Sequence, residues 1–204
     1  MIRFISPFLF LGFFAIAQQC SSQNVIVHVI MEKKKTTSDN DTIYYDFSRH
    51  LSWKDFKGIP DNNHFGGAVA ASGFAFDSQM NFDGENIYLN IGVYTFFSKS
   101  QSWKRPQINS DYHLLHEQHH FDITRLGTQK FMMEIENAHF TKKNYNTLLT
   151  SIFDKAYKEN EAMQALYDSE TRHSLNVNKQ LEWNNKIAAE IEKLKESVAV
   201  KIDK

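Results

Sequence analysis

The strongest constraint on the fold of this chain is a change of hydrophobic period near Asn109. Before this residue apolar and polar side chains alternate, as they do from Ile87 to Val93, which is the period of a half-buried strand. After it apolar side chains recur every three or four residues, which is the period of an amphipathic helix. Strands followed by helices predict an α+β domain.

The first half of the chain is expected to form an antiparallel or mixed β-sheet. A polar stretch without apolar residues, 32–41, is typical of a linker or an exposed loop and separates the first strand from the others. A turn at Asp83-Gly84 precedes the last strand. The expected strands are residues 24–31, 42–47, 65–76 and 86–97.

Three helices are expected after the sheet. Ser110 is a favourable N-cap for the first, and Asp111 in the first turn complements the helix dipole. Gly127 in this helix allows another element to approach closely. The other two helices, 142–166 and 177–198, each carry one apolar face.

Length and charge limit the function classes. The 204 residues are enough for one domain, and 23 Lys and Arg residues nearly balance 24 Asp and Glu residues. Such a chain lacks the basic footprint that nucleic acid or an anionic membrane surface requires, so neither is expected as a partner. We divide it into 1–17, a signal peptide, 18–41, the N-terminal strand and linker, and 42–204, the candidate enzyme domain.

The N-terminus predicts export to the periplasm or the exterior. Arg3 precedes an apolar run, 4–17, that ends in the small-x-small cleavage signal Ala15-Ile16-Ala17. The run is about 14 residues long, too short for a membrane span of about 20 residues. The single cysteine, Cys20, excludes an internal disulfide framework. Cleavage after Ala17 is favoured, and the alternative is a lipid anchor at Cys20.

The motif His116-Glu117-Gln118-His119-His120 carries the expected chemistry. On a helix, His116 and His120 project from one face and can bind one zinc ion, whereas His119 points away from that face. Bound zinc lowers the pKa of a water molecule to about 7, and Glu117 is the expected general base that completes its deprotonation. The rival interpretation is a surface helix that carries several histidines incidentally.

A catalytic zinc site needs a third protein ligand. Ile123 and Leu126 exclude the extended motif with glycine and a third histidine, and Lys130 stands where another subclass has aspartate. The best remaining candidates lie in the expected break between the second and third helices, in Tyr167–His173. His173 is preferred there, with Asp168 and Glu170 as the alternatives.

Several segments together resemble a known family. They are residues 51–60 (LSWKDFKGIP), 70–72 (AAS), 102–103 (SW), 114–123 (LLHEQHHFDI) and 167–173 (YDSETRH), with Gln180 and Trp183. This set resembles the bacterial domain-of-unknown-function family DUF922, described as secreted zinc-dependent proteases. The resemblance implies a zinc-binding HExxH enzyme and marks Thr171-x-His173 as functional, which supports His173 as a ligand. The chain departs from the family at Ser174, where glycine is usual.

Three further residues are assigned supporting roles. Asp122 is expected to orient a ligand histidine without itself binding the metal, or to be a helix-surface carboxylate. Tyr167 or Arg172 is expected to help bind the developing oxyanion.

The sequence as a whole predicts an exported zinc-dependent hydrolase, with peptide or protein as substrate and zinc on His116, His120 and His173. The alternative is a non-catalytic metal-binding or protein-interaction module of the cell envelope. The motif specifies how water is activated and does not specify which bond is attacked.

Overall fold

A computed structural model of the chain describes residues 24–32, 34 and 40–202. The predicted signal peptide, 1–17, and Cys20 lie outside the described residues. Within the part that is described, no helix combines the length and the apolar character needed to cross a membrane.

The sheet is organised around one long strand, β5 (Ile87–Ser98). It pairs in parallel with β1 (Val25–Met31) and antiparallel with β2 (Thr42–Tyr44) and β4 (Ser72–Phe82). A separate antiparallel pair joins β3 (Ala68–Val69) to β6 (Trp103–Lys104). Because β1 belongs to the main sheet, residues 42–204 alone do not contain all of its strands.

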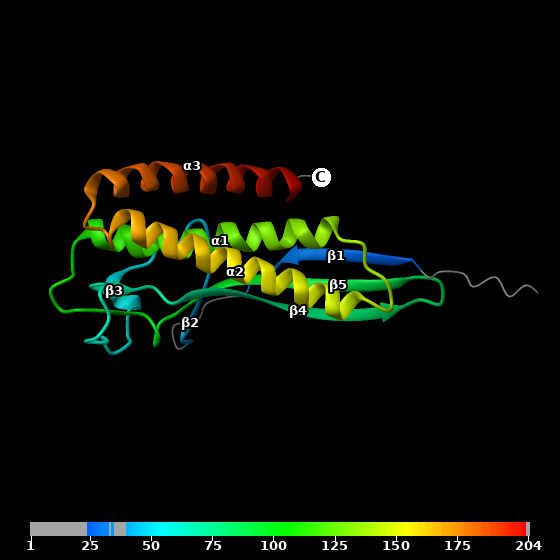
Figure 1. Cartoon of the computed structure of the whole chain (residues 1–204). Coiled ribbons are helices and arrows are strands. Elements are labelled where there is room, and N and C mark those ends of the chain that lie inside the picture. Colours follow the sequence, from blue (N-terminus) through cyan, green and yellow to red (C-terminus); the bar gives the residue numbers. More distant parts are fainter. Residues whose placement is uncertain (1–23, 33, 35–39, 203–204) are drawn as a thin grey trace, which may run out of the picture.

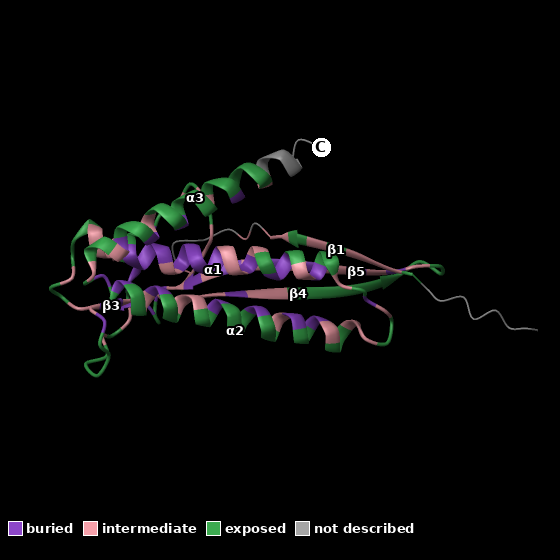
Figure 2. Ribbon diagram, turned by 45° about the horizontal axis from the view of Figure 1, so that its top comes forward, coloured by how far each residue is buried: buried purple, intermediate pink, exposed green. Residues whose placement is uncertain are grey.

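Three helices follow the sheet, as predicted, and the fold is α+β (Figure 1). Helix α1 packs on the sheet, α2 runs beside α1, and α3 lies over the side of α1 that is turned away from the sheet (Figure 1). Buried residues are concentrated along α1, between the sheet and the other helices (Figure 2). The helices are α1 (Asp111–Asn137), α2 (Tyr145–Thr171) and α3 (Val177–Ile202).

The alternation of β5 explains how the sheet holds α1. Every second side chain is buried, and Leu89, Ile91 and Val93 form one core with Phe131 and Ile135 of α1. Removing these apolar surfaces from water is worth about 25 cal/mol per Å². The helix that carries the HExxH motif is thus fixed on the sheet by a continuous apolar core.

Two local predictions about α1 are confirmed. The Oγ of Ser110 accepts a hydrogen bond from the backbone N–H of His113 at 3.3 Å, so Ser110 is the N-cap. At Gly127 an added Cβ would lie 2.7 Å from Oδ1 of Asn160, which shows that α2 approaches α1 closely there.

The boundaries of some elements differ from the expected ones. The expected strand 65–76 is interrupted, with β3 ending at Val69 and β4 beginning at Ser72, and β2 ends at Tyr44. Helix α2 continues to Thr171, because Tyr167 is fully buried in a cluster with Ile123 and Trp183 that keeps this part of the chain helical.

The connection between α2 and α3 is a left-handed turn. Arg172, His173 and Ser174 have φ angles of 52°, 50° and 68°. For residues with a Cβ this conformation costs roughly 1–2 kcal/mol each. The angle at Ser174 gives a physical reason for glycine at this position in the family that the sequence resembles.

Candidate metal centre

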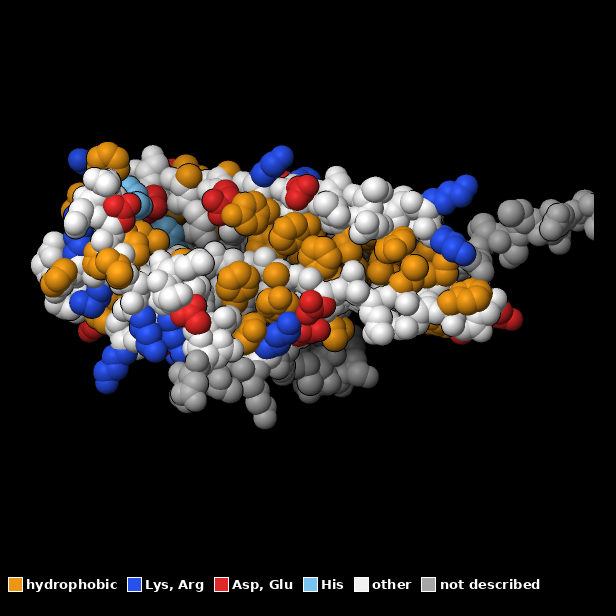
Figure 3. All heavy atoms as spheres, turned by 90° about the horizontal axis from the view of Figure 1, so that it is seen from below, with side chains coloured by type: hydrophobic (Ala, Val, Ile, Leu, Met, Phe, Trp, Pro, Cys, Tyr) orange, Lys and Arg blue, Asp and Glu red, His pale blue; other side chains and the backbone are white. Residues whose placement is uncertain are grey.

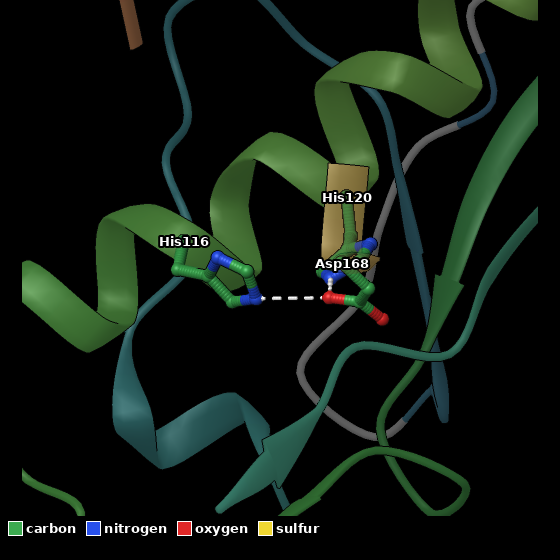
Figure 4. A group of neighbouring side chains, drawn as sticks. All are labelled: His116, His120 and Asp168. Carbon is green, nitrogen blue, oxygen red and sulfur yellow. Dashed lines mark hydrogen bonds and ion pairs between the residues drawn. The ribbon is translucent and has the colours of Figure 1, made fainter. Parts of the chain in front are cut away.

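His116, His120 and Asp168 form the centre of the site, and we refer to these three residues as the metal centre. The two histidines lie one turn apart on α1, and Asp168 approaches from the last turns of α2 (Figure 4). Oδ1 of Asp168 is 3.2 Å from Nε2 of His116 and 3.1 Å from Nε2 of His120. Among the described residues, the three ligand atoms all lie within 4.8 Å of one another.

Two glutamines hold the opposite nitrogens of the histidine rings. Nδ1 of His116 is 2.8 Å from Oε1 of Gln180, and Nδ1 of His120 is 2.6 Å from Oε1 of Gln164. An amide oxygen only accepts, so each Nδ1 carries the proton and, in the neutral ring, leaves the Nε2 lone pair free for a metal.

The orientation of both amides is itself fixed. The Nε2 group of Gln180 donates to the hydroxyl of Tyr167 at 2.7 Å. The Nε2 group of Gln164 donates to the backbone oxygen of His120 at 2.9 Å. Each amide oxygen therefore faces a histidine, as a ligand-orienting carbonyl must.

The electrostatics of the metal-free centre are set by burial and by one shared carboxylate. Burial opposes charge on His120, but the hydrogen bond and charge of Asp168 outweigh it and raise the pKa of His120 to about 9. Burial lowers the pKa of His116. Although burial acts against it, the two imidazoles hold the pKa of Asp168 well below its usual range. A metal ion would thus displace a proton from His120.

Glu117 is buried beside this centre. Glu117 is only 5% exposed. Burial raises the pKa of its carboxyl group to about 7, although His120 and the backbone N–H of Ala70 act to lower it. Its Oε2 has no hydrogen-bond partner among the described residues. A buried acceptor of this kind normally has a partner, so the atom is suited to a ligand or water in the site.

These observations fit zinc. Two imidazole nitrogens and one carboxylate oxygen are a donor set that catalytic zinc sites use, with a further position left for water or substrate. The unpartnered Oε2 of Glu117 and the two glutamine-held rings would supply the general base and the ligand orientation that such a site needs.

The metal centre opens into a cavity of about 750 Å³, within the usual size range of ligand sites. Its walls come from the chain around β3, from α1, and from the end of α2 with the turn that follows it. Glu117, Arg172 and His173 line it, together with two histidines to which the sequence gave no role, His64 and His113.

The structure places the three candidates for the third ligand differently. Asp168 lies in the metal centre. His173 lies beside it, with Nδ1 3.3 Å from Oδ1 of Asp168 and its side chain 41% exposed. Glu170 accepts a hydrogen bond from Nε1 of Trp183 at 2.8 Å. His173 as a ligand stays a prediction, and the geometry adds Asp168, one of the two alternatives that the sequence offered.

The supporting residues also have distinct places. Asp122 contacts His119 at 3.1 Å and the hydroxyl of Tyr45 at 2.9 Å, so the histidine it orients is one outside the metal centre. The ring of Tyr167 stacks on His116, with centroids 4.7 Å apart, and its hydroxyl lies 3.3 Å from the backbone oxygen of His116. Of the proposed oxyanion donors, Arg172 is the one that lines the cavity.

Gln164 is the residue for which the sequence gave no signal strong enough to assign a role. It precedes Asp168 by four residues, so both lie on one face of α2. The sequence could not reveal that Gln164 and Asp168 share a helix face, because the expected helix ended at Leu166, before Asp168.

Comparison with known proteins gives no match: no protein-family model, no curated protein and no solved structure matches the chain. The resemblance to DUF922 therefore stays a prediction from the motifs quoted above.

Proposed function

We propose that this protein is an exported zinc-dependent hydrolase, with a peptide or protein as its substrate. One observation carries the proposal. Two glutamine-oriented histidines and Asp168 converge within 4.8 Å, beside a buried carboxylate, Glu117, that has an unpartnered oxygen among the described residues.

Metal binding and proton transfer are assigned to different residues. Zinc held by His116, His120 and Asp168 would supply Lewis-acid polarisation of the water and of the substrate carbonyl. Glu117 accepts a proton from the attacking water at its free oxygen and passes it to the leaving nitrogen. In the metal-free protein burial raises the pKa of Glu117 towards the ambient pH, where a group that takes and returns a proton works best.

The test is metal content and turnover measured on the same preparations. Zinc per chain is determined by elemental analysis for the wild type, Glu117→Gln, Asp168→Ala and His173→Ala, and hydrolysis is followed on a library of quenched fluorescent peptides. We expect about one zinc per chain in the wild type and in Glu117→Gln, loss of zinc in Asp168→Ala, and turnover that Glu117→Gln abolishes.

The other outcomes are equally informative. Hydrolysis that survives in Glu117→Gln would refute the mechanism. Zinc without turnover on any peptide would favour a non-catalytic metal-binding module, and a wild type without zinc would favour a protein-interaction module. His173→Ala decides its role directly, because a ligand histidine is needed for tight zinc binding and a neighbouring histidine is not.

A further inference from the structure

Two exposed apolar side chains stand at the mouth of the metal-centre cavity. Among the described residues, the three most exposed large apolar side chains are Phe65 (94%), Ile59 (91%) and Leu175 (74%). Phe65 and Leu175 both line this cavity, although they are far apart in the sequence. We call them the rim pair. Single exposed apolar side chains are common, but two that line one cavity suggest a binding role.

The backbone on both sides of Phe65 is fixed. The Nη2 group of Arg105 donates to the backbone oxygen of His64 at 2.6 Å, and the backbone N–H of Gly66 donates to Nδ1 of His64 at 3.0 Å. The exposed ring is therefore presented by an anchored segment, which limits the entropy lost when it contacts a ligand.

Leu175 is presented by the left-handed turn. Its N–H donates to the backbone oxygen of Arg172 at 3.2 Å. The hydroxyl of Tyr112, from the first turn of α1, donates to the backbone oxygen of Ser174 at 2.6 Å. The bond from Tyr112 ties the turn, and Leu175 with it, to the helix that carries the HExxH motif.

Polarity changes with depth in the cavity. His116, which would hold the zinc, and Glu117, which would take the proton from the attacking water, are 4% and 5% exposed, whereas the rim pair is open to solvent. Figure 3 shows histidine side chains within a hollow at one end of the molecule, with hydrophobic side chains around it. Outside the metal centre and Glu117, the charged residues of the lining are Glu161 and Arg172, whose opposite signs favour neither charge in a ligand.

We propose that the rim pair recognises an apolar side chain of the substrate close to the bond that is cut. This inference rests on the proposed function and names its substrate class: a peptide segment with a bulky apolar residue, such as leucine, beside the scissile bond. Replacing that leucine by alanine would weaken binding by about tenfold, because roughly half of a leucine side chain's transfer free energy is recovered at an open rim.

Binding is tested apart from cleavage by using zinc-loaded Glu117→Gln and two blocked, fluorescein-labelled hexapeptides that differ only by leucine or alanine at one position. Anisotropy gives the dissociation constant of each. The rim-pair variant carries Phe65→Ala with Leu175→Ala. The matched control is Ile59→Ala, which removes an equally exposed apolar side chain that does not line the cavity.

We expect the leucine peptide to bind about tenfold more tightly to Glu117→Gln and to the Ile59 control, and the preference to vanish in the rim-pair variant. Equal affinities for the two peptides, no binding of either, or a preference that survives in the rim-pair variant would overturn the inference. Leucine preference without hydrolysis by the wild type would leave the rim pair standing and refute the proposed function. Hydrolysis by the wild type without the leucine preference would support the proposed function and refute the role of the rim pair.

Discussion

Gln180→Leu tests whether α3 contributes to the metal centre. Gln180 is 1% exposed, and its amide links Nδ1 of His116 (2.8 Å), the hydroxyl of Tyr167 (2.7 Å) and Oδ1 of Asn184 (2.8 Å). Leucine has a similar volume but neither accepts nor donates a hydrogen bond. The substitution thus removes the polar links and leaves the packing largely intact.

The main cost falls on His116, whose Nδ1–H is left buried without an acceptor. Such an unsatisfied group costs about 1–3 kcal/mol. Tyr167 keeps its contact with the backbone oxygen of His116, so we expect a total of about 2–4 kcal/mol, or a fall in Tm of roughly 5–15 °C for a chain of this size. Loss of a ligand-orienting partner also weakens metal binding by about 10–100-fold.

The assay measures both effects separately. Tm is determined by circular dichroism on metal-free protein, and zinc affinity by competition with a chromophoric chelator. Thr128→Val is the matched control. It removes buried hydroxyl contacts of α1, the helix that carries His116, to Thr95 and to the backbone of Thr124, both 2.8 Å long, without touching a histidine. If Gln180→Leu lowers Tm but binds zinc as tightly as Thr128→Val does, the orienting role of Gln180 is refuted.

Three further predictions concern stability. Gly58→Ala should lower the free energy of unfolding by about 1–3 kcal/mol in urea titrations, because a Cβ would lie 2.6 Å from the backbone oxygen of Ser100 and 2.9 Å from that of Ser102; an unchanged midpoint would contradict this. Ser174→Gly should raise stability by about 0.5–1 kcal/mol by relieving the positive φ, while Ser174→Ala, which keeps the Cβ, should give no gain in the same titration. In metal-free protein, burial raises the pKa of Glu117 from 4.5 to about 7, so the stability linked to its proton is fully present below about pH 4.5 and lost as the pH rises through about 7. Glu117→Gln should therefore raise Tm more at pH 8 than at pH 4.5, and an equal change at both would refute the assignment.

The order of elements and the core of the site were predictable from local patterns. The alternation of β5 and the capped start of α1 are properties of neighbouring residues, and the i, i+4 spacing brings His116 and His120 together on any helix. For the same reason Glu117 and the α+β class followed from the sequence.

What could not be predicted depends on packing between distant segments. Helix α2 continues past Leu166 because Tyr167 is buried against α1 and α3, a contact that no local period reveals. Glutamine is a residue type common on solvent-facing helix surfaces, so Gln164 and Gln180 do not stand out in the sequence. Their amides face the histidines only because the three helices pack together. The position of Asp168 depends on both effects, so spacing alone ranked His173 above it.

The hydrogen bond between Gln180 and His116 gives the last helix a chemical role that its distance from the motif conceals. A fragment that ended at the left-handed turn, before Val177, would still contain His116, His120, Asp168 and Glu117. It would therefore have every candidate metal ligand of the metal centre and the candidate general base. In that fragment nothing from α3 would select which nitrogen of His116 carries the hydrogen, and the ring would be free to exchange tautomers. Truncated forms of this protein should therefore retain α3, since removing it would replace one defined tautomer of His116 with a mixture.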